Sequence, residues 1–421
     1  MNKNKNILIW QSGEPLHLDK KNHNPMRAIN LADFLLKKNL NVTLVSSNFD
    51  HTHKKHRKKI DKYKEFFISK SFKIVLVQSP GYKNNISLSR LYDHFILAIN
   101  LRNYLLNLKK KPNLGIIGFP PIEPSIYCAY WLRKKKIPFL FDVKDLWPEY
   151  FYERVSNKIL SIFIRLIFYF HDLFLKKAFK MANGIIANNS YFLKSILDKI
   201  KRKKNKFDKV IYLTKPQIKT NSNFFLQKIK FKKDCFNIYF CGRINFDVFD
   251  FETILKSLKI LDEKKINFHF YIGGYGNLNF LKKKINYYSL NKKITVLGFV
   301  NKFQHTKMLK NSNIFIAPFK NKKNFSSNFT NKFIEAIQNN LLIITPLKGD
   351  VAKFIISNKV GLIYEEYNSI DLAQKIIQIK DNFYYFKNQL NTKNFKSILT
   401  KFDHENNYSN FLKLINELTK Y

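Results

Sequence analysis

The sequence of 421 residues has few cysteines, few acidic residues and no long uninterrupted apolar run. Its three cysteines, Cys128, Cys235 and Cys241, have no paired ligand spacing and lie in or beside apolar runs, where a free thiol usually acts as a small hydrophobic residue. The pattern indicates neither a disulfide framework nor a cysteine-based metal site. A cytosolic compartment fits this cysteine usage best.

The most apolar segment, residues 159–175, is interrupted by Arg165, His171 and Asp172. A membrane-spanning helix needs about 20 nearly uninterrupted apolar residues, so this segment is too short and too polar to cross a bilayer. Residues 1–10 are basic at the start but pass directly into a short strand-like run, without the longer apolar region and cleavage site of an export signal. We therefore expect a protein that is neither exported nor membrane-spanning.

Basic residues far outnumber acidic ones, 75 against 30, and the formal net charge is +45. Clustered cations suit nucleic acids, but only nine of the 75 are arginine and no arginine follows Arg243. This skew, alongside abundant Asn, Ile, Phe and Tyr, is typical of drift toward AT-rich codons, which exchanges arginine for lysine wherever only charge matters. We interpret most of the charge as a solvated lysine surface attracted to anionic membranes; the alternative is a directed nucleic-acid surface.

The chain contains ample core material, with 45% apolar and 16% aromatic residues, and it is long enough for two domains. Short β-rich runs alternate with helical patterns, as in residues 7–10, 26–38 and 41–46, and the alternation restarts after a polar stretch at 201–230. This pattern predicts an α/β protein of two doubly wound Rossmann-like domains facing across a cleft. We place the N-terminal domain at 1–205, the C-terminal domain at 206–403 and a final helix, returning to the first domain, at 404–421.

The strongest candidate site lies in the second half, in four short segments that follow predicted strands or open a helix. These segments are Gly242-Arg243, Gly273-Gly274-Tyr275-Gly276, Gly298-Phe299-Val300 and Asn331-Lys332-Phe333-Ile334-Glu335. Open α/β sheets bind their ligands at the carboxyl ends of their strands. Taken alone, the glycines suit an ordinary strand-to-helix turn, and Lys332 with Glu335 suits an intrahelical ion pair. Together they supply a cation for a diphosphate, a glycine turn beside it, a base-binding segment and a carboxylate for ribose hydroxyls, as a nucleotide-sugar site requires.

The order of these segments resembles the glycosyltransferases of the GT-B fold, specifically family 4, retaining enzymes that build bacterial surface polysaccharides. The chain is most similar to the lipopolysaccharide and capsule branch, on three further segments. These are Gly13-Glu14-Pro15, Pro25-Met26-Arg27 and Asp142-Val143-Lys144-Asp145-Leu146-Trp147-Pro148-Glu149, where the branch has Asp-x-Arg-Asp-x-Trp-Pro-Glu. The resemblance covers nearly the whole chain.

The resemblance implies a role for individual residues. Those implied in catalysis are Arg243, Lys332 and Asp145. Those implied in donor binding are Gly242, Gly273, Gly274, Gly276, Phe299, Val300, Asn331 and Glu335, with Arg243 meeting the diphosphate and Glu335 the ribose. Those implied in acceptor or sugar binding are Gly13, Glu14, Arg27 and Asp142. For Asp142 and Asp145 the structural alternative is a carboxylate that caps the helix after Trp147.

Three positions depart from the family pattern. Ser327 stands where members usually have an acidic residue, eight positions before the ribose-binding glutamate. No lysine follows Arg243 within residues 244–250, so Lys332 is the nearest candidate for a second diphosphate cation. The glycine that normally ends the glutamate helix is replaced by Asn339 or Asn340, which also tolerates the left-handed conformation.

The implied reaction is front-face displacement, in which the donor diphosphate leaves, the acceptor attacks from the same side and configuration is retained. We expect no cofactor and no metal, since the chain has no Asp-x-Asp metal motif. The expected partners are a UDP- or GDP-sugar and a lipid-linked or polysaccharide acceptor, but no nucleic acid. Two rivals remain, a nucleotide-sugar epimerase of the same fold and a non-enzymatic nucleic-acid-binding protein.

A helical wheel of residues 157–180 gives one polar seam in an otherwise apolar helix. The seam consists of Lys158, Ser161, Arg165, Asp172 and Lys176. The helix is either buried in its domain or lies in the plane of a membrane, and we favour membrane contact. The expected location is therefore cytoplasmic, peripheral at the inner face of the cell membrane.

Overall fold

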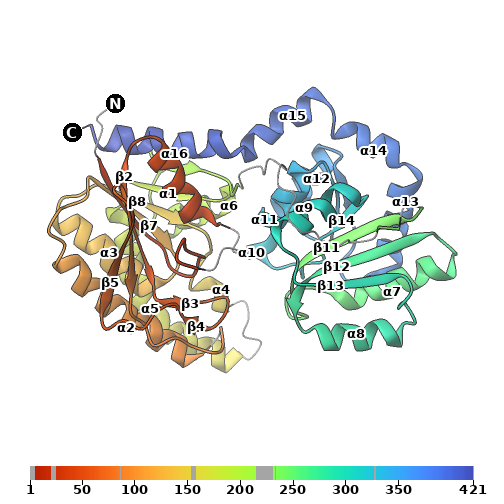
Figure 1. The fold of residues 1–421 in the computed structure, drawn as a ribbon, viewed down its shortest axis with the longest axis horizontal. Coiled ribbons are helices and arrows are strands. Elements are labelled where there is room, and N and C mark those ends of the chain that lie inside the picture. The colour runs from red at the N-terminus through yellow and green to blue at the C-terminus, as the bar shows by residue number, and fades with distance from the viewer. Residues whose placement is uncertain are drawn as a thin grey trace. The chain divides into compact units, whose positions relative to one another are not determined.

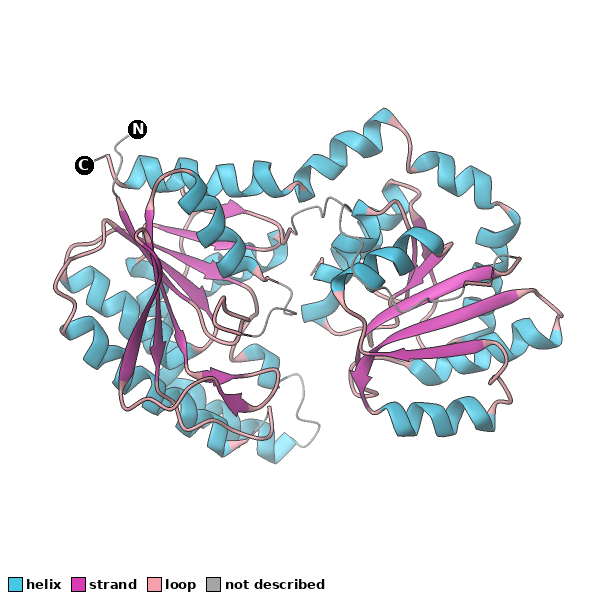
Figure 2. Cartoon of the chain, in the orientation of Figure 1, coloured by secondary structure: helices cyan, strands magenta, loops and turns pink. Residues whose placement is uncertain are grey.

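The computed structural model describes residues 5–19, 25–85, 87–152, 158–214, 231–232, 234–326 and 329–420. The chain forms two compact units, one of Met1–Lys215 with His404–Tyr421 and one of Pro216–Asp403. Both combine a largely parallel sheet with helices (Figures 1 and 2), which confirms the predicted α/β fold with two Rossmann-like domains. Residues 215–230, most of the predicted junction, lie outside the described part of the chain.

The first unit is built on an eight-stranded sheet in the order β10-β9-β8-β7-β1-β2-β6-β5. All neighbouring strands are parallel except β5 and β6, which pair antiparallel at one edge. The strands are β1 (Asn6–Trp10), β2 (Asn41–Ser47), β5 (Tyr63–Ser69), β6 (Phe72–Val77), β7 (Leu114–Phe119), β8 (Phe139–Val143), β9 (Gly184–Ala187) and β10 (Lys209–Val210), with a separate pair β3 (Phe49–Asp50) and β4 (Lys55–His56).

Helices cover both faces of this sheet. They are α1 (Arg27–Lys37), α2 (Leu88–Leu106), α3 (Ile122–Lys134), α4 (Glu149–Tyr152), α5 (Lys158–Met181), α6 (Ser190–Lys199) and α16 (His404–Leu418). Alternate residues of β1 enter opposite cores: Ile7 and Ile9 pack with α1 and α16, while Leu8 and Trp10 pack with α2, α3, α5 and α6. The carboxyl ends of the parallel strands therefore meet at one edge, with helices on either side.

The second unit is built on six parallel strands in the order β13-β12-β11-β14-β15-β16. The strands are β11 (Phe236–Ile244), β12 (Phe268–Gly276), β13 (Ile294–Gly298), β14 (Ile314–Ile316), β15 (Leu342–Thr345) and β16 (Gly361–Ile363). The helices are α7 (Phe251–Glu263), α8 (Leu278–Tyr287), α9 (Lys302–Asn311), α10 (Lys323–Ser326), α11 (Asn331–Gln338), α12 (Gly349–Ser357), α13 (Ser369–Asp381), α14 (Phe383–Gln389) and α15 (Lys393–Leu399), followed by a 3₁₀ turn at Thr400–Phe402.

Strand order in the second unit reverses next to β11. From β11 the chain passes through α7, β12 and α8 to the edge strand β13, then returns through α9 to β14 on the other side of β11. Figure 2 shows α7 and α8 on one face of the sheet and α9, α11 and α12 on the other. The carboxyl ends of β11 and β14 thus form a topological switch point, where open α/β sheets bind ligands.

Two strands beside this switch point are longer than the sequence pattern predicted. We expected strands at 237–241 and 267–272, with the glycines in loops beyond them. Strands β11 and β12 instead remain paired through Gly242↔Gly274, Arg243↔Tyr275 and Ile244↔Gly276. The strands are longer because Gly242, Gly274 and Gly276 have no side chains, so the backbones of β11 and β12 stay in contact to their ends.

Candidate functional site

The glycines of β12 are required by the close approach of β11. A Cβ atom on Gly274 would lie 1.7 Å from the Gly242 carbonyl oxygen, and one on Gly276 would lie 2.4 Å from the Ile244 oxygen. Both glycines also have positive φ angles, 146° and 123°. Their first role is therefore to let the backbones of β11 and β12 pair closely at the switch point. Helix α8 begins after them at Leu278.

Gly242 is required for a different reason, since it leaves room for a lysine. A Cβ atom on Gly242 would lie 2.1 Å from Nζ of Lys332, so the ammonium group lies against the strand backbone. The same Nζ lies 4.6 Å from the ring centre of Phe249, 5.6 Å from Phe240 and 5.7 Å from Phe319. Cation–π contact with three rings holds this charge beside the switch point.

Arg243 is the second cation that the sequence predicts at this site. It occupies the penultimate position of β11, directly after Gly242, and its side chain is exposed. Lys332 belongs to the first turn of α11, which follows β14 on the other side of the switch. The fold thus places Lys332 beside Gly242, the neighbour of Arg243 in β11, from a segment 90 residues away.

Glu335 lies one turn after Lys332 and faces a histidine that the sequence analysis did not identify. Its Oε2 is 3.1 Å from Nε2 of His305 on α9, and the other ring nitrogen of His305, Nδ1, is 2.8 Å from the Tyr239 hydroxyl. The His305 and Glu335 side chains are 11% and 16% exposed. The carboxylate predicted to bind ribose is thus held by a nearly buried hydrogen-bonded chain.

The surroundings of this chain shift its pKa values. Burial lowers the pKa of His305, but hydrogen bonds and charges from Cys241 and Glu335 outweigh burial and raise it to about 9. Burial raises the pKa of Cys241, yet hydrogen bonds from His305 and Tyr239 and the charge of Lys332 bring it below its usual value. Burial, followed by Cys241 and Glu335, raises the pKa of the Tyr239 hydroxyl. His305 is therefore cationic at neutral pH beside Glu335.

The remaining predicted donor residues surround the same strand ends. Val300 contacts the sheet, since its Cγ2 lies 2.5 Å from where a Cβ atom of Gly273 would stand. Phe299, one residue earlier, is 63% exposed. Asn331 is the first residue of α11 and half-buried. Ser327 lies outside the described residues.

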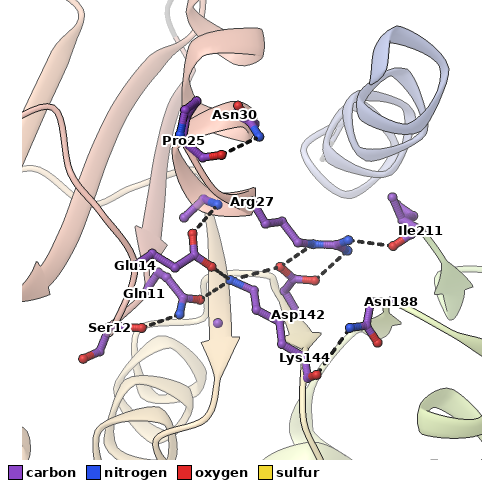
Figure 3. Close-up of polar contacts among 12 residues, drawn as sticks. Gln11, Ser12, Glu14, Pro25, Arg27, Asn30, Asp142, Lys144, Asn188 and Ile211 are labelled. Carbon is purple, nitrogen blue, oxygen red and sulfur yellow. Dashed lines mark hydrogen bonds and ion pairs between the residues drawn. The ribbon is translucent and has the colours of Figure 1, made fainter. Parts of the chain in front are cut away.

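The predicted acceptor residues of the first unit form a second charged cluster (Figure 3). Arg27, at the start of α1, makes a two-pronged ion pair with Asp142 at the end of β8: Nε to Oδ2 is 2.8 Å and Nη2 to Oδ1 is 2.7 Å. Arg27 Nη1 also donates to the Ile211 carbonyl at 2.6 Å. The two side chains are 2% and 5% exposed. Because the Arg27 and Asp142 side chains are buried and paired with each other, we interpret them as residues that hold the cluster together.

Glu14 joins this cluster through both of its carboxylate oxygens. Oε2 accepts the Ala28 backbone N–H at 2.9 Å, which places the negative charge at the N-terminus of α1. Oε1 pairs with Nζ of Lys144, and the same ammonium donates to Gln11 Oε1 at 2.5 Å. Gly13, with φ 79°, turns the chain between Gln11 and Glu14.

Lys144 is the functional candidate of the first unit that the sequence analysis missed. Its signal was present, because it occupies the cationic position of the Asp-x-Arg-Asp segment. It is half-buried, and Asn188 Nδ2 donates to its carbonyl at 3.3 Å. The neighbouring Asp145 is half-buried in the segment between β8 and α4.

Helix α5 turns its apolar stripe outward. Its exposed apolar side chains, at three- and four-residue steps, are Ile159, Ile162, Leu166, Tyr169, Phe170, Leu173 and Phe174. On the inner side, Asp172 pairs with Lys176 at 2.9 Å and with Lys199 of α6 at 2.5 Å. Of the predicted polar seam, Asp172 and Lys176 are half-buried and Arg165 is exposed, while the side chains of Lys158 and Ser161 are not described.

A groove of about 560 Å³ joins this stripe to α2. Phe95 and Ile99 of α2 and Phe170 and Phe174 of α5 line it, with Tyr130 of α3 between them. Helix α2 adds further exposed apolar side chains, Leu88, Tyr92 and Leu106. The outward side chains of α2 and α5 form one continuous surface, called here the apolar face.

Within the residues that the structure describes, no group of three or more His, Cys, Asp and Glu side chains is arranged to hold a metal ion. Among the described helices, none has the length and apolar content needed to span a bilayer.

Comparison with known proteins gives one family match and many similar structures. Residues 221–397 match the family model described as "Glycosyl transferases group 1". No curated protein matches the chain. Sucrose-phosphate synthase from Thermosynechococcus elongatus is similar in structure, with TM-score 0.67 and 14% identity over 98% of this chain and 99% of that chain.

Two other similar structures are those of HepE and WaaG. HepE from Anabaena, solved in complex with UDP, has TM-score 0.63 and 12% identity over 98% of this chain and 100% of that chain. WaaG, a glycosyltransferase involved in lipopolysaccharide biosynthesis, has TM-score 0.59 and 12% identity over 99% of this chain and 100% of that chain. At these identities the likeness shows a shared fold, the GT-B fold. Together with the family match over the second unit, it supports a GT-B glycosyltransferase.

Proposed function

We propose that the chain is a retaining glycosyltransferase of family 4, in the lipopolysaccharide and capsule branch, that moves a sugar from a nucleotide-sugar to a lipid-linked or polysaccharide acceptor. One observation carries the proposal: Gly242, Lys332 and Glu335 meet at the switch point of the second unit, inside the segment that matches the group 1 family. HepE was solved with UDP, which supports UDP as the nucleotide of the donor; GDP is the alternative.

The site residues divide the work of a front-face displacement. Arg243 and Lys332 supply positive charge to the diphosphate, which gains negative charge as the bond to the sugar breaks. Glu335 accepts the ribose hydroxyls, and the backbone at Phe299 and Val300 borders the base. In the first unit Lys144, Glu14 and Asp145 are the polar groups proposed for the acceptor or the transferred sugar, while the Arg27–Asp142 pair holds them in place.

A donor screen tests the reaction itself. Purified protein is incubated with individual UDP- and GDP-sugars and a membrane extract as acceptor source, and products are identified by mass spectrometry. We expect one donor to be consumed with a matching mass increase on a lipid or glycan. Conversion of a donor to an isomer without any acceptor would instead identify an epimerase, and binding of generic RNA without UDP at physiological salt would favour the nucleic-acid alternative.

Removal of Glu335 tests the ribose assignment. Glu335→Ala should weaken UDP binding, measured by calorimetry, by about 1.5–3 kcal/mol, the range for hydrogen bonds to a charged group. Glu263→Ala is the matched control, because Glu263 is an exposed acid on α7 of the same unit. Equal UDP affinity in the two variants would contradict the assignment.

Chelation tests the metal independence that we propose. Because two cationic side chains serve the diphosphate, turnover in excess EDTA should equal turnover with added magnesium or manganese. The measurement is the initial rate with the donor found in the screen. An enzyme that is inactive in EDTA and restored by either metal would refute this part of the proposal.

The apolar face is the proposed contact with the membrane. Its exposed aliphatic and aromatic side chains lie on a unit of a chain with a net charge of +45, and lysines at the end of α5, Lys177 and Lys180, are exposed. An amphipathic helix beside exposed lysines suits the surface of an anionic bilayer. The proposed location is the inner face of the cell membrane, where a lipid-linked acceptor would be within reach.

A further inference from the structure

Beneath the switch point of the second unit, one imidazole ring connects three elements. Tyr239 belongs to β11, His305 to α9 and Glu335 to α11. The ring of His305 has a partner at each nitrogen, Tyr239 at Nδ1 (2.8 Å) and Glu335 at Nε2 (3.1 Å). With both nitrogens hydrogen-bonded, the ring has one favoured orientation, and its Nε2 holds the Glu335 carboxylate by a hydrogen bond.

A glutamate needs such support to serve as a ligand. Its side chain has three rotatable bonds, so fixing it in one conformation costs conformational entropy when the ligand binds. A carboxylate can accept several hydrogen bonds at once, so a bond to Nε2 is compatible with bonds to hydroxyl groups. Burial lowers the pKa of His305, but hydrogen bonds and charges from Cys241 and Glu335 raise it to about 9, so the ring is protonated next to the carboxylate.

We propose that His305 is the positioning residue of the nucleotide site: it fixes Glu335 in the orientation that accepts the ribose hydroxyls. The proposal rests on the proposed function, in which Glu335 binds ribose. His305 itself touches no part of the donor, and it acts only through the carboxylate.

The test compares nucleotides with and without the hydroxyl groups in question. Affinities for UDP and for 2′,3′-dideoxyuridine diphosphate are measured by calorimetry on the full chain, and the same pair is prepared for GDP. The ratio of the two affinities, the ribose preference, reports on the contacts that the two hydroxyl groups make. A change that merely disturbs the fold would weaken both nucleotides equally.

Two substitutions of equal length separate hydrogen bonding from shape. His305→Met fills the space but cannot donate to Glu335, so the ribose preference should fall about tenfold while the dideoxy affinity changes less than twofold. His305→Gln keeps a donor, so it should retain the preference within about threefold. Tyr239→Phe, which removes the partner of Nδ1, should lower the preference by a smaller factor.

The outcomes distinguish the positioning role of His305 from the proposed function on which it rests. If Glu335→Ala keeps the ribose preference, or if the wild type binds neither UDP nor GDP, the proposed function fails. If Glu335→Ala loses the preference while His305→Met and His305→Gln behave alike, only the positioning role is overturned. An unchanged preference in Tyr239→Phe overturns it as well, and this variant serves if His305→Met does not fold.

Discussion

Arg243 and Lys332 carry the same charge in different settings. Lys332 is enclosed by three phenylalanine rings and the backbone of Gly242, whereas the guanidinium of Arg243 is exposed at the end of β11. A planar guanidinium can bind two diphosphate oxygens at once, and an ammonium cannot. Arg243 is therefore the residue on which the leaving group should depend most.

Exchanging that arginine for lysine tests this dependence. Arg243→Lys should lower kcat more than it raises KM, by roughly tenfold or more, since charge on the departing diphosphate is greatest in the transition state. Initial rates with the donor from the screen provide the measurement. Arg133→Lys is the matched control, because Arg133 is exposed in the last turn of α3 in the other unit. Near-wild-type kinetics in both variants would contradict the binding of the diphosphate by the Arg243 guanidinium.

The residue scale also shows what the sequence can and cannot reveal. Gly242, Arg243, Lys332 and Glu335 could be singled out as candidates because they follow a predicted strand or lie in a predicted helix, and those elements follow from apolar periodicity. His305 was missed because nothing local marks it. It lies 30 residues from Glu335, and their contact arises only when α9 and α11 pack on the same face of the sheet. Lys144 was missed for another reason, because the resemblance implied roles only for the carboxylates on either side of it, Asp142 and Asp145.

At the scale of elements, the paired ends of β11 and β12 depend on the absence of side chains. The backbones of Gly242 and Gly274 lie so close that any Cβ on Gly274 would overlap a carbonyl oxygen, at 1.7 Å. The strands cannot keep their register with a larger residue there. The site is thus built on a strand pair whose stability is sensitive to a single methyl group.

An alanine at Gly274 should therefore destabilise the second unit. We expect Gly274→Ala to lower its free energy of unfolding by roughly 3 kcal/mol or more, through overlap and an unfavourable φ of 146°. Gly298→Ala is the control: its φ is 68° but no atom lies within 4 Å, so only the backbone cost of about 1 kcal/mol applies. Equal destabilisation of both would refute the steric argument.

The measurement must report on the second unit alone. All three tryptophans, Trp10, Trp131 and Trp147, lie in the first unit, so their fluorescence would follow the wrong transition. Hydrogen–deuterium exchange of peptides from β11 and β12 reports the local stability directly.

Strand and helix positions were predictable where the pattern was strong. The buried strands β1, β7 and β8 consist mostly of apolar residues, and the helices between them repeat apolar residues at helical spacing. The antiparallel edge strand β5 was not predicted, since its residues alternate poorly and most are exposed or half-buried. Edge strands pack on one face only and leave a weaker trace in the sequence.

At the scale of the whole molecule, a strongly cationic chain presents a large uncharged surface. On the apolar face, the Leu166 and Phe170 side chains are 65% and 67% exposed. Exposed apolar clusters of this kind mark sites of contact with membranes or other proteins. Wheel analysis predicted an amphipathic helix and left two alternatives, burial in its domain or a place in the plane of a membrane. The apolar side chains of α5 named above are exposed on their unit, and Asp172 on the adjacent side pairs with Lys176 and with Lys199 of α6.

Charged substitutions on this face should release the protein from membranes. Leu166→Glu combined with Phe170→Glu should weaken binding to phosphatidylglycerol vesicles at least tenfold in a sedimentation assay, since two apolar anchors are lost and two negative charges gained. Ile356→Glu with Tyr384→Glu is the control, because these side chains are 63% and 84% exposed on the second unit. Equal loss of binding in both double variants would show that net charge alone drives adsorption.

The first unit is made from two stretches of chain, and the second unit separates them. Phe411 of α16 stacks on the Arg27 guanidinium at 5.1 Å, Tyr408 reaches the Arg27 carbonyl at 3.4 Å, and Lys5 Nζ donates to Thr419 at 2.6 Å. A ribosome adds residues in order, so residues 216–403 are synthesised before α16 exists. At about 5–20 residues per second, this interval lasts roughly 10–40 seconds. Throughout it, nascent α1 and its buried charge lack the cover that α16 provides, so the first unit cannot complete this core until residues 404–421 have been synthesised.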